Sequence, residues 1–166
     1  MWIQFCQALI LSCSMLLFLF NAPSADAASE RFGLTVYGFS YHPDLKDSQG
    51  NKLEGWNPGM GVSWNLKESE RFVWNLEGGL YRDSSKDLAE YFSFSCKAKV
   101  IPSIRLGAAL SLIHSVSYNQ GRPILAPLPV ATYWTKFVSV NFLYAPRYKE
   151  INKNSVFAIY ATVPLQ

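Results

Sequence analysis

The sequence has few cysteines and histidines, and this restricts the chemistry open to it. It contains 3 cysteines and 2 histidines in 166 residues. Cys6 and Cys13 lie within the first 28 residues, so the remainder of the chain keeps only Cys96 and cannot form an internal disulfide. Two histidines and one cysteine are also too few, at the spacing they have, to build a metal site.

The sequence also lacks a basic cluster, a convincing helix and a Gly-rich loop leading into a helix. After residue 28 it carries 15 Lys and Arg against 11 Asp and Glu, a net charge of +4 that is spread along the chain. A nucleic-acid-binding domain would gather its basic residues on one face or segment, and a phosphate-binding loop would need the glycines. Nucleic acid is therefore not expected as a partner, whereas a net positive charge suits an anionic surface.

Residues 1–28 predict a secretory signal peptide, which leaves residues 29–166 as one mature domain. An apolar run from Ala8 to Phe20 is followed by a proline-containing break and by the small residues Ala25, Ala27 and Ala28. This order is typical of an apolar signal region and its cleavage site. The run is short for a membrane helix, which needs roughly 20 apolar residues, so we expect export.

From residue 31 onward, apolar residues alternate with small or polar ones, and a period of two predicts strands. In one segment Met60, Val62 and Trp64 alternate with Gly61 and Ser63. Near the start of this region, Tyr37, Phe39 and Tyr41 alternate with Gly38, Ser40 and His42. The pattern predicts eight strands, over residues 32–43, 58–66, 71–83, 87–99, 102–114, 124–134, 136–145 and 155–164.

The two faces of these strands predict an all-β fold, an eight-stranded antiparallel transmembrane β-barrel of the outer-membrane type. One face is bulky and apolar and the other is small and polar, which is the pattern of a barrel that faces lipid outside. Glu77, Lys97 and Arg105 fall on the small face, where charges can pair inside a lumen. Five aromatic residues near strand ends are expected in interfacial girdles: Trp64, Trp74, Tyr81, Trp134 and Tyr144. The alternative is a soluble eight-stranded barrel such as a lipocalin, with the apolar face inward.

Connection lengths predict which residues share one end of the barrel. The connections after the first, fifth and seventh strands are long and all the even-numbered ones are short, so the odd-numbered ones are expected at the cell exterior. His42 then ends the first strand at this outer rim, and Asp83 and Ser84 end the third. Their alternation directs His42 and Asp83 to the lumen.

These rim residues allow two interpretations. His42, Asp83 and Ser84 can serve as base, orienting group and hydroxyl. The segment from Asp83 to Asp87 is also a good turn sequence, because Asp and Ser side chains bond nearby backbone groups. His114 and Ser115, at the outer end of the fifth strand, form a second and weaker candidate pair.

Proline is concentrated in the sixth strand, at Pro123, Pro127 and Pro129. Each proline lacks an N–H and cannot donate to a neighbouring strand. The prolines therefore predict either a lateral gap, through which a lipid chain can pass from the bilayer into the lumen, or a loop that lies just above the hydrocarbon.

Several segments resemble the outer-membrane lipid A palmitoyltransferases (PagP-like proteins), over about residues 34–146. The segments that carry the resemblance are YGFSYHPD with His42, NPGMGVSWNL, GGLYRDSSKD with Asp83 and Ser84, RPILAPLPVATYW and LYAP. The resemblance implies that His42, Asp83 and Ser84 are catalytic. It also implies a barrel interior that measures acyl chains and proline-weakened strand pairs that admit lipid from the side.

The implied activity is transfer of an acyl chain from a glycerophospholipid to lipid A or another outer-leaflet lipid, in the bacterial outer membrane and by a monomer. No cofactor is expected, because ester exchange is close to energy-neutral. Two alternatives stay open: a lipid A deacylase that uses water as the acceptor, and a non-catalytic barrel for lipid binding or membrane integrity.

Overall fold

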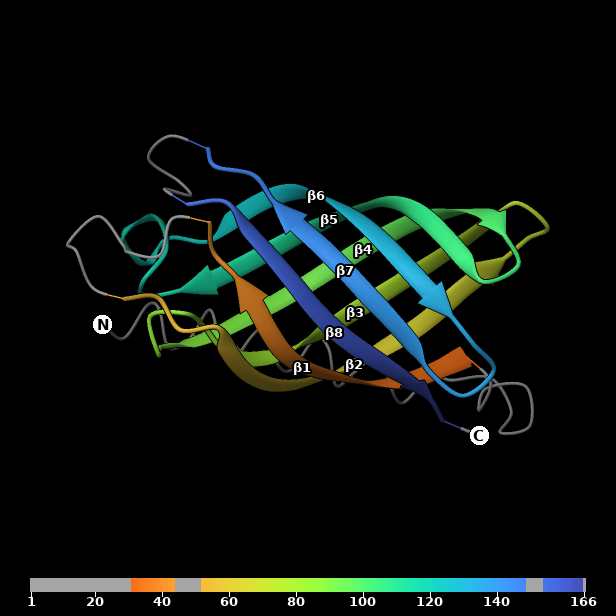
Figure 1. Cartoon of the computed structure of the whole chain (residues 1–166), viewed down its shortest axis with the longest axis horizontal. Helices are drawn as coiled ribbons and strands as arrows, with labels where there is room; N and C mark the ends of the chain where they lie inside the picture. Colours follow the sequence, from red (N-terminus) through yellow and green to blue (C-terminus); the bar gives the residue numbers. More distant parts are fainter. Residues whose placement is uncertain (1–30, 44–51, 149–153, 166) are drawn as a thin grey trace.

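A computed structural model describes residues 31–43, 52–148 and 154–165, so the predicted signal peptide lies outside the described residues. Eight antiparallel strands pair in sequence order and close into a barrel through β1 and β8 (Figure 1). The strands are β1 (Phe32–Tyr41), β2 (Trp56–Glu68), β3 (Phe72–Arg82), β4 (Leu88–Ile101), β5 (Ile104–Ser115), β6 (Ile124–Trp134), β7 (Ser139–Ala145) and β8 (Val156–Pro164). No helix within the described ranges is long and apolar enough to cross a membrane.

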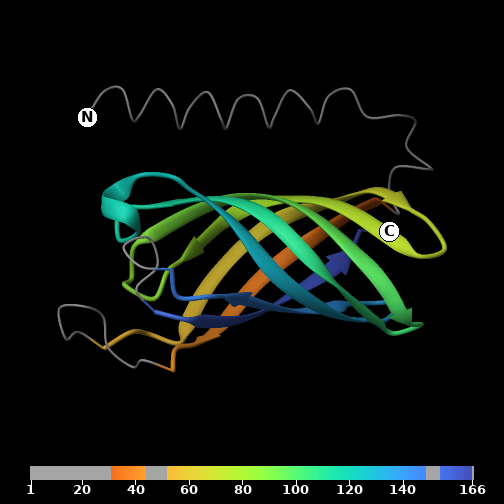
Figure 2. The same ribbon diagram turned by 90° about the horizontal axis from the view of Figure 1, so that it is seen from above.

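The predicted eight-stranded antiparallel barrel is confirmed, with strand ends that differ from the sequence-based ranges by a few residues. Figure 2 shows the strands strongly inclined to the long axis of the barrel, as closure of so few strands requires. Antiparallel neighbours satisfy one another's backbone groups, and closure leaves no free sheet edge at the level where all strands pair.

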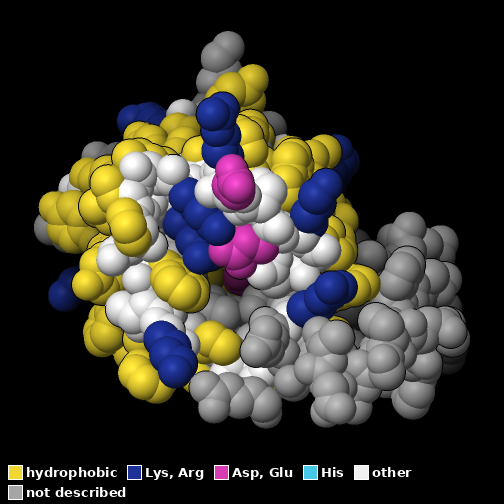
Figure 3. Space-filling view, turned by 90° about the vertical axis from the view of Figure 1, so that its right-hand side faces the viewer, with side chains coloured by type: hydrophobic (Ala, Val, Ile, Leu, Met, Phe, Trp, Pro, Cys, Tyr) yellow, Lys and Arg dark blue, Asp and Glu magenta, His cyan; other side chains and the backbone are white. Residues whose placement is uncertain are grey.

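Side chains on the outside of the barrel are large and apolar. Met60, Leu125 and Phe39 expose 69%, 63% and 62% of their surface, and hydrophobic side chains surround the body in Figure 3. The buried residues include many small polar ones: Thr35, Ser63, Ser111, Thr132 and Asn141. The soluble alternative, with its apolar face inward, is therefore wrong.

Charged residues predicted for the lumen do lie inside and have polar partners there. Lys97 Nζ donates to Thr132 Oγ1 at 3.4 Å. Arg105 is buried and lies 3.4 Å from Glu68, which also pairs with Lys99 at 2.6 Å. Figure 3 views the end of the barrel at which β2 is joined to β3 and β4 is joined to β5. It shows acidic side chains at the centre with Lys and Arg around them. Pairing inside the lumen keeps these charges away from the apolar exterior.

Three aromatic residues lie elsewhere than predicted. The β1 register shifts between Tyr37 and Phe39, and this bulge turns Tyr37 from the outer face into the lumen. Tyr81, predicted in a girdle, stacks on Tyr37 inside the barrel with ring centroids 5.4 Å apart. Trp134 covers the guanidinium of Arg105, 4.5 Å from its ring centroid, instead of standing alone in a girdle.

The two ends of the barrel differ in their connections, as predicted. One end carries the connections that follow β1, β3, β5 and β7 and is here named the long-loop end. The other, the short-turn end, carries the connections at residues 69–71, 102–103 and 135–138, together with the start of β1 and the end of β8. Because antiparallel strands alternate in direction, the residues that follow β1, β3 and β5 all meet at the long-loop end (Figure 1).

Candidate active site

His42 and Ser84 form a close pair at the long-loop end. His42 follows β1 directly, and Ser84 lies two residues after the end of β3. The His42 Nε2 atom is 2.6 Å from Ser84 Oγ, and the two residues expose only 7% and 6% of their surface. The structure therefore brings together two of the three predicted site residues, as a histidine and a hydroxyl in hydrogen-bond contact.

The buried environment of His42 favours its neutral form. Burial lowers the pKa of His42 from its ordinary value of 6.5, because the charged imidazolium loses its hydration. Its Nδ1 atom is buried and has no hydrogen-bond partner among the described residues. A neutral ring with Nε2 directed at Ser84 can accept the hydroxyl proton, which is the arrangement of a general base and its nucleophile.

Ser40 and Asn57 complete the polar contacts of this pair, and the sequence did not single them out. Ser40 Oγ lies 3.0 Å from His42 Nε2 and 3.2 Å from Ser84 Oγ. Asn57 accepts a hydrogen bond from Ser40 and donates through Nδ2 to Ser84 Oγ at 3.3 Å. The same amide donates to the Arg82 carbonyl at 3.0 Å, which ties β2 to the end of β3. Ser40 shares the lumen face with His42, and this parity is the signal that would have found it.

Asp83 is fully buried, yet its bonds hold two loops together. Its Oδ1 atom accepts from the backbone N–H groups of Ser85 at 2.9 Å and Asp87 at 3.0 Å. Its Oδ2 atom accepts from the hydroxyls of Ser115, at 2.6 Å, and Ser117. None of these four bonds goes to the His42 ring, so the expected direct orientation of the histidine by Asp83 is absent from these contacts. Asp83 instead fixes the turn on which Ser84 stands.

His114 and Ser115, the second candidate pair, point in different directions. The His114 ring contacts Glu90 Oε1 at 2.9 Å and the Gly121 carbonyl at 3.2 Å. Ser115 donates to Asp83 in the lumen. They are successive residues of β5, and successive side chains of a strand face opposite sides. The two therefore cannot work as a histidine–serine dyad.

The wall of the barrel opens beside the site, between β6 and β7. These strands pair only from Val130 with Leu143 to Trp134 with Ser139, so the part of β6 from Ile124 to Pro129 has no β7 partner. Pro127 and Pro129 lie in this part of the strand itself, paired with β5, so the interpretation that places them in a loop is wrong. Proline is tolerated along such an unpaired strand edge because no ladder donor is needed there.

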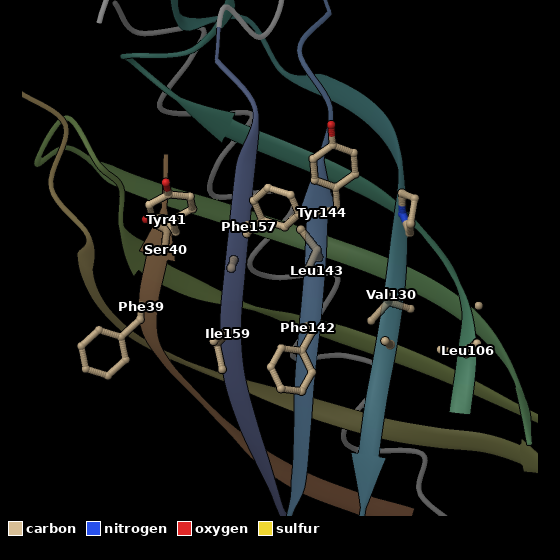
Figure 4. A pocket seen from close by; sticks show the side chains of 14 residues that line it. Phe39, Ser40, Tyr41, Leu106, Val130, Phe142, Leu143, Tyr144, Phe157 and Ile159 are labelled. Carbon is tan, nitrogen blue, oxygen red and sulfur yellow. The ribbon is translucent and has the colours of Figure 1, made fainter. Parts of the chain in front are cut away.

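A cavity of about 520 Å³ lies at this opening (Figure 4). It is lined by outward-facing apolar residues and by a smaller number of inward-facing ones. Ser40 is one of the residues that border this cavity, and its hydroxyl contacts both His42 and Ser84. The aromatic members of its wall are Phe39, Tyr41, Phe142, Tyr144 and Phe157.

The described residues contain no group of three or more His, Cys, Asp or Glu side chains that could hold a metal ion. A neutral imidazole against a buried hydroxyl, next to an amide donor, suits nucleophilic attack on an ester carbonyl.

Comparison with known proteins gives the fold and no family. No family model matches the chain. No curated protein matches it. Among solved structures it is similar to the solution NMR structure of the de novo designed protein TMB2.3, with 12% sequence identity and a TM-score of 0.55 over 86% of this chain and 99% of that one. A likeness at this identity carries the architecture alone, and the chain accordingly has the fold of an eight-stranded antiparallel β-barrel compatible with a membrane location.

Proposed function

We propose that this chain is an outer-membrane acyltransferase, which moves an acyl chain from a glycerophospholipid to lipid A or another lipid of the outer leaflet. The observation that carries the proposal is the His42–Ser84 contact of 2.6 Å beside an opening in the barrel wall. A histidine–serine pair at a lipid-accessible opening suits an ester of a membrane lipid better than a water-soluble substrate. The apolar exterior supports a position in a bilayer.

The first half of the reaction forms an acyl-enzyme. Ser84 Oγ attacks the ester carbonyl of the donor while His42 Nε2 takes the hydroxyl proton. The Asn57 amide, 3.3 Å from Ser84 Oγ, is a side-chain N–H donor for the negative charge that develops on the carbonyl oxygen. The intermediate then collapses, His42 returns the proton to the glycerol oxygen, and the lysophospholipid leaves with the acyl chain bound to Ser84.

The second half reverses these steps with a different alcohol. A hydroxyl of the acceptor lipid gives its proton to His42 and attacks the acyl–Ser84 ester. Ser84 Oγ leaves and regains the proton from His42. One ester is broken and one is formed, so no oxidant, reductant or cofactor is consumed. Water in place of the acceptor alcohol would make the same site a deacylase.

The test is expression in a bacterium that lacks its own lipid A palmitoyltransferase, followed by mass spectrometry of lipid A. We expect a mass gain of one acyl chain with the wild-type chain and none with the empty vector. A mass loss of one acyl chain would instead identify the deacylase. Identical spectra with and without the chain would contradict action on lipid A.

The pH dependence of the reaction follows from the buried histidine. Because burial lowers the pKa of His42, the neutral base persists below pH 6.5, and the acid limb of the rate profile is expected to have its midpoint below that value. Stability falls in the same direction, since the unfolded chain binds the proton first as the pH drops below 6.5. His114→Gln, which removes the other histidine, should leave the limb in place. An acid limb centred above pH 6.5 would contradict the assignment of His42 as base.

A further inference from the structure

Tyrosines fill the lumen on the short-turn side of the His42–Ser84 pair. Tyr37 stacks on Tyr160 at 4.8 Å and meets the edge of Tyr91 at 5.2 Å, and Tyr81 packs against the same group. Tyr37 lies in β1, three residues before Ser40. Tyr81 lies in β3, two residues before Asp83, which follows the strand. This tyrosine cluster (Tyr37, Tyr81, Tyr91 and Tyr160) therefore lies directly beneath the site.

The tyrosine cluster is tied to a carboxylate and has little room to move aside. Tyr37 and Tyr91 donate to Glu77 Oε1 at 2.8 and 3.1 Å. Gly61 faces the Tyr91 hydroxyl so closely that a Cβ on it would lie 2.5 Å away. An acyl chain that entered here would break these hydrogen bonds and place methylenes against buried polar groups, which is unfavourable.

The cavity at the wall opening gives an acyl chain a second possible position. One row of paired residues crosses four strands: Ser40 with Ala158, Ala158 with Leu143, and Leu143 with Val130. Pairing between β6 and β7 begins at this row, so the lower edge of the opening is level with Ser40. From there the cavity continues over the outward faces of β7, β8 and β1, past Phe142 and Ile159 (Figure 4).

We infer that the acyl chain of the donor lipid lies in this wall cavity and keeps its tail in the surrounding lipid, rather than running down the barrel axis. The inference rests on the proposed function. The cavity, of about 520 Å³, is within the range of ligand sites, and its apolar lining suits methylenes. The tyrosine cluster closes the axial course. Because the tail then lies outside the protein, no side chain limits the length of the acyl chain. Donors of different acyl length should therefore react at similar rates.

Photolabelling tests the position of the chain without requiring turnover. The full chain is folded into vesicles containing a phosphatidylcholine with a diazirine midway along its sn-1 chain, and adducts are located by mass spectrometry of peptides. Adducts are expected on Phe142, Phe157 and Ile159 above the level at Phe92, an exposed residue on β4 that reports ordinary surrounding lipid.

Two matched variants sharpen this readout. Ala131 lines the cavity, whereas Leu76 has the same half-buried exposure and faces outward on β3, and neither of its strand partners lines the cavity. Ala131→Trp should lower the excess labelling about tenfold, which corresponds to losing the burial of roughly two methylene groups. Leu76→Trp should leave it unchanged. Adducts on Tyr91 or Tyr160, or equal labelling of the two variants, would overturn the inference.

A parallel assay separates this inference from the proposed function. Product is measured with phosphatidylcholines whose sn-1 chains increase in length, and similar initial rates are expected throughout. A sharp loss of rate on adding two carbons would overturn the wall position. Cavity labelling with no product from any donor would contradict acyl transfer but leave the lipid site standing. Labelling of the lumen tyrosines together with product would contradict the wall position of the chain but leave acyl transfer standing.

Discussion

Ser84→Ala is expected to abolish acyl transfer, with a fall in initial rate of roughly 10³-fold. The substitution removes the hydroxyl that lies 2.6 Å from the base and leaves the backbone of the turn intact.

His42→Ala should reduce the rate by roughly 10²- to 10⁴-fold, because it removes the proton acceptor. The double variant should be no slower than the slower single variant, since the two groups act as one unit. Lysophospholipid release by the purified chain measures all three.

Ser85→Ala is the matched control for Ser84→Ala. Ser85 is the next residue in the same turn and is exposed, and its backbone N–H, which bonds to Asp83, is retained in the variant. Its rate should equal that of the wild-type chain. Ser40 gives the sharpest alternative, because its hydroxyl is 3.0 Å from the same His42 nitrogen. An active Ser84→Ala together with an inactive Ser40→Ala would move the nucleophile to Ser40.

The barrel was predictable from the sequence because one physical signal repeats along the whole chain. Strand residues alternate between lipid-like and polar surroundings, so the period of two reports both the strands and their inner and outer faces. The signal fails where the backbone breaks the period. Alternation alone predicts an outward Tyr37, because the bulge before Phe39 depends on how β1 pairs with β2 and β8, which the sequence of β1 does not contain.

The candidate site was predictable in part. His42 and Ser84 were found because strand direction and loop length place the ends of β1 and β3 on one rim. Asn57 was not found, because its contact with Ser84 depends on the pairing of three strands and on how far β2 extends. The sequence identifies Asp83 as a site residue, but it does not predict which groups Asp83 bonds to. Its partner Ser117 lies in the connection between β5 and β6, which the pattern of β3 does not place near Asp83.

Replacement of Asp83 should separate a positioning residue from a catalytic charge. Asp83→Ala leaves two backbone N–H groups and two hydroxyls without their common acceptor, and Asp83 is 0% exposed. The expected loss is roughly 2–4 kcal/mol of unfolding free energy, because each unsatisfied buried group costs about 1–3 kcal/mol. Activity should fall with it, since the turn that carries Ser84 loses its anchor. Urea unfolding in vesicles and the initial rate measure the two effects.

Asp83→Asn decides between the two roles. The amide oxygen can still accept from the N–H groups of Ser85 and Asp87, and the new NH₂ can donate to the hydroxyls of Ser115 and Ser117 after these rotate. If Asp83 works through these contacts, as its bonding indicates, the variant should keep its rate within about tenfold of the wild-type rate, because few buried groups lose a partner. In a serine hydrolase triad, where the carboxylate bonds to the histidine, the same substitution lowers the rate by roughly 10⁴. A loss of that size in a folded Asp83→Asn variant would mean that the carboxylate acts on His42 during turnover, and the positioning role would have to be abandoned.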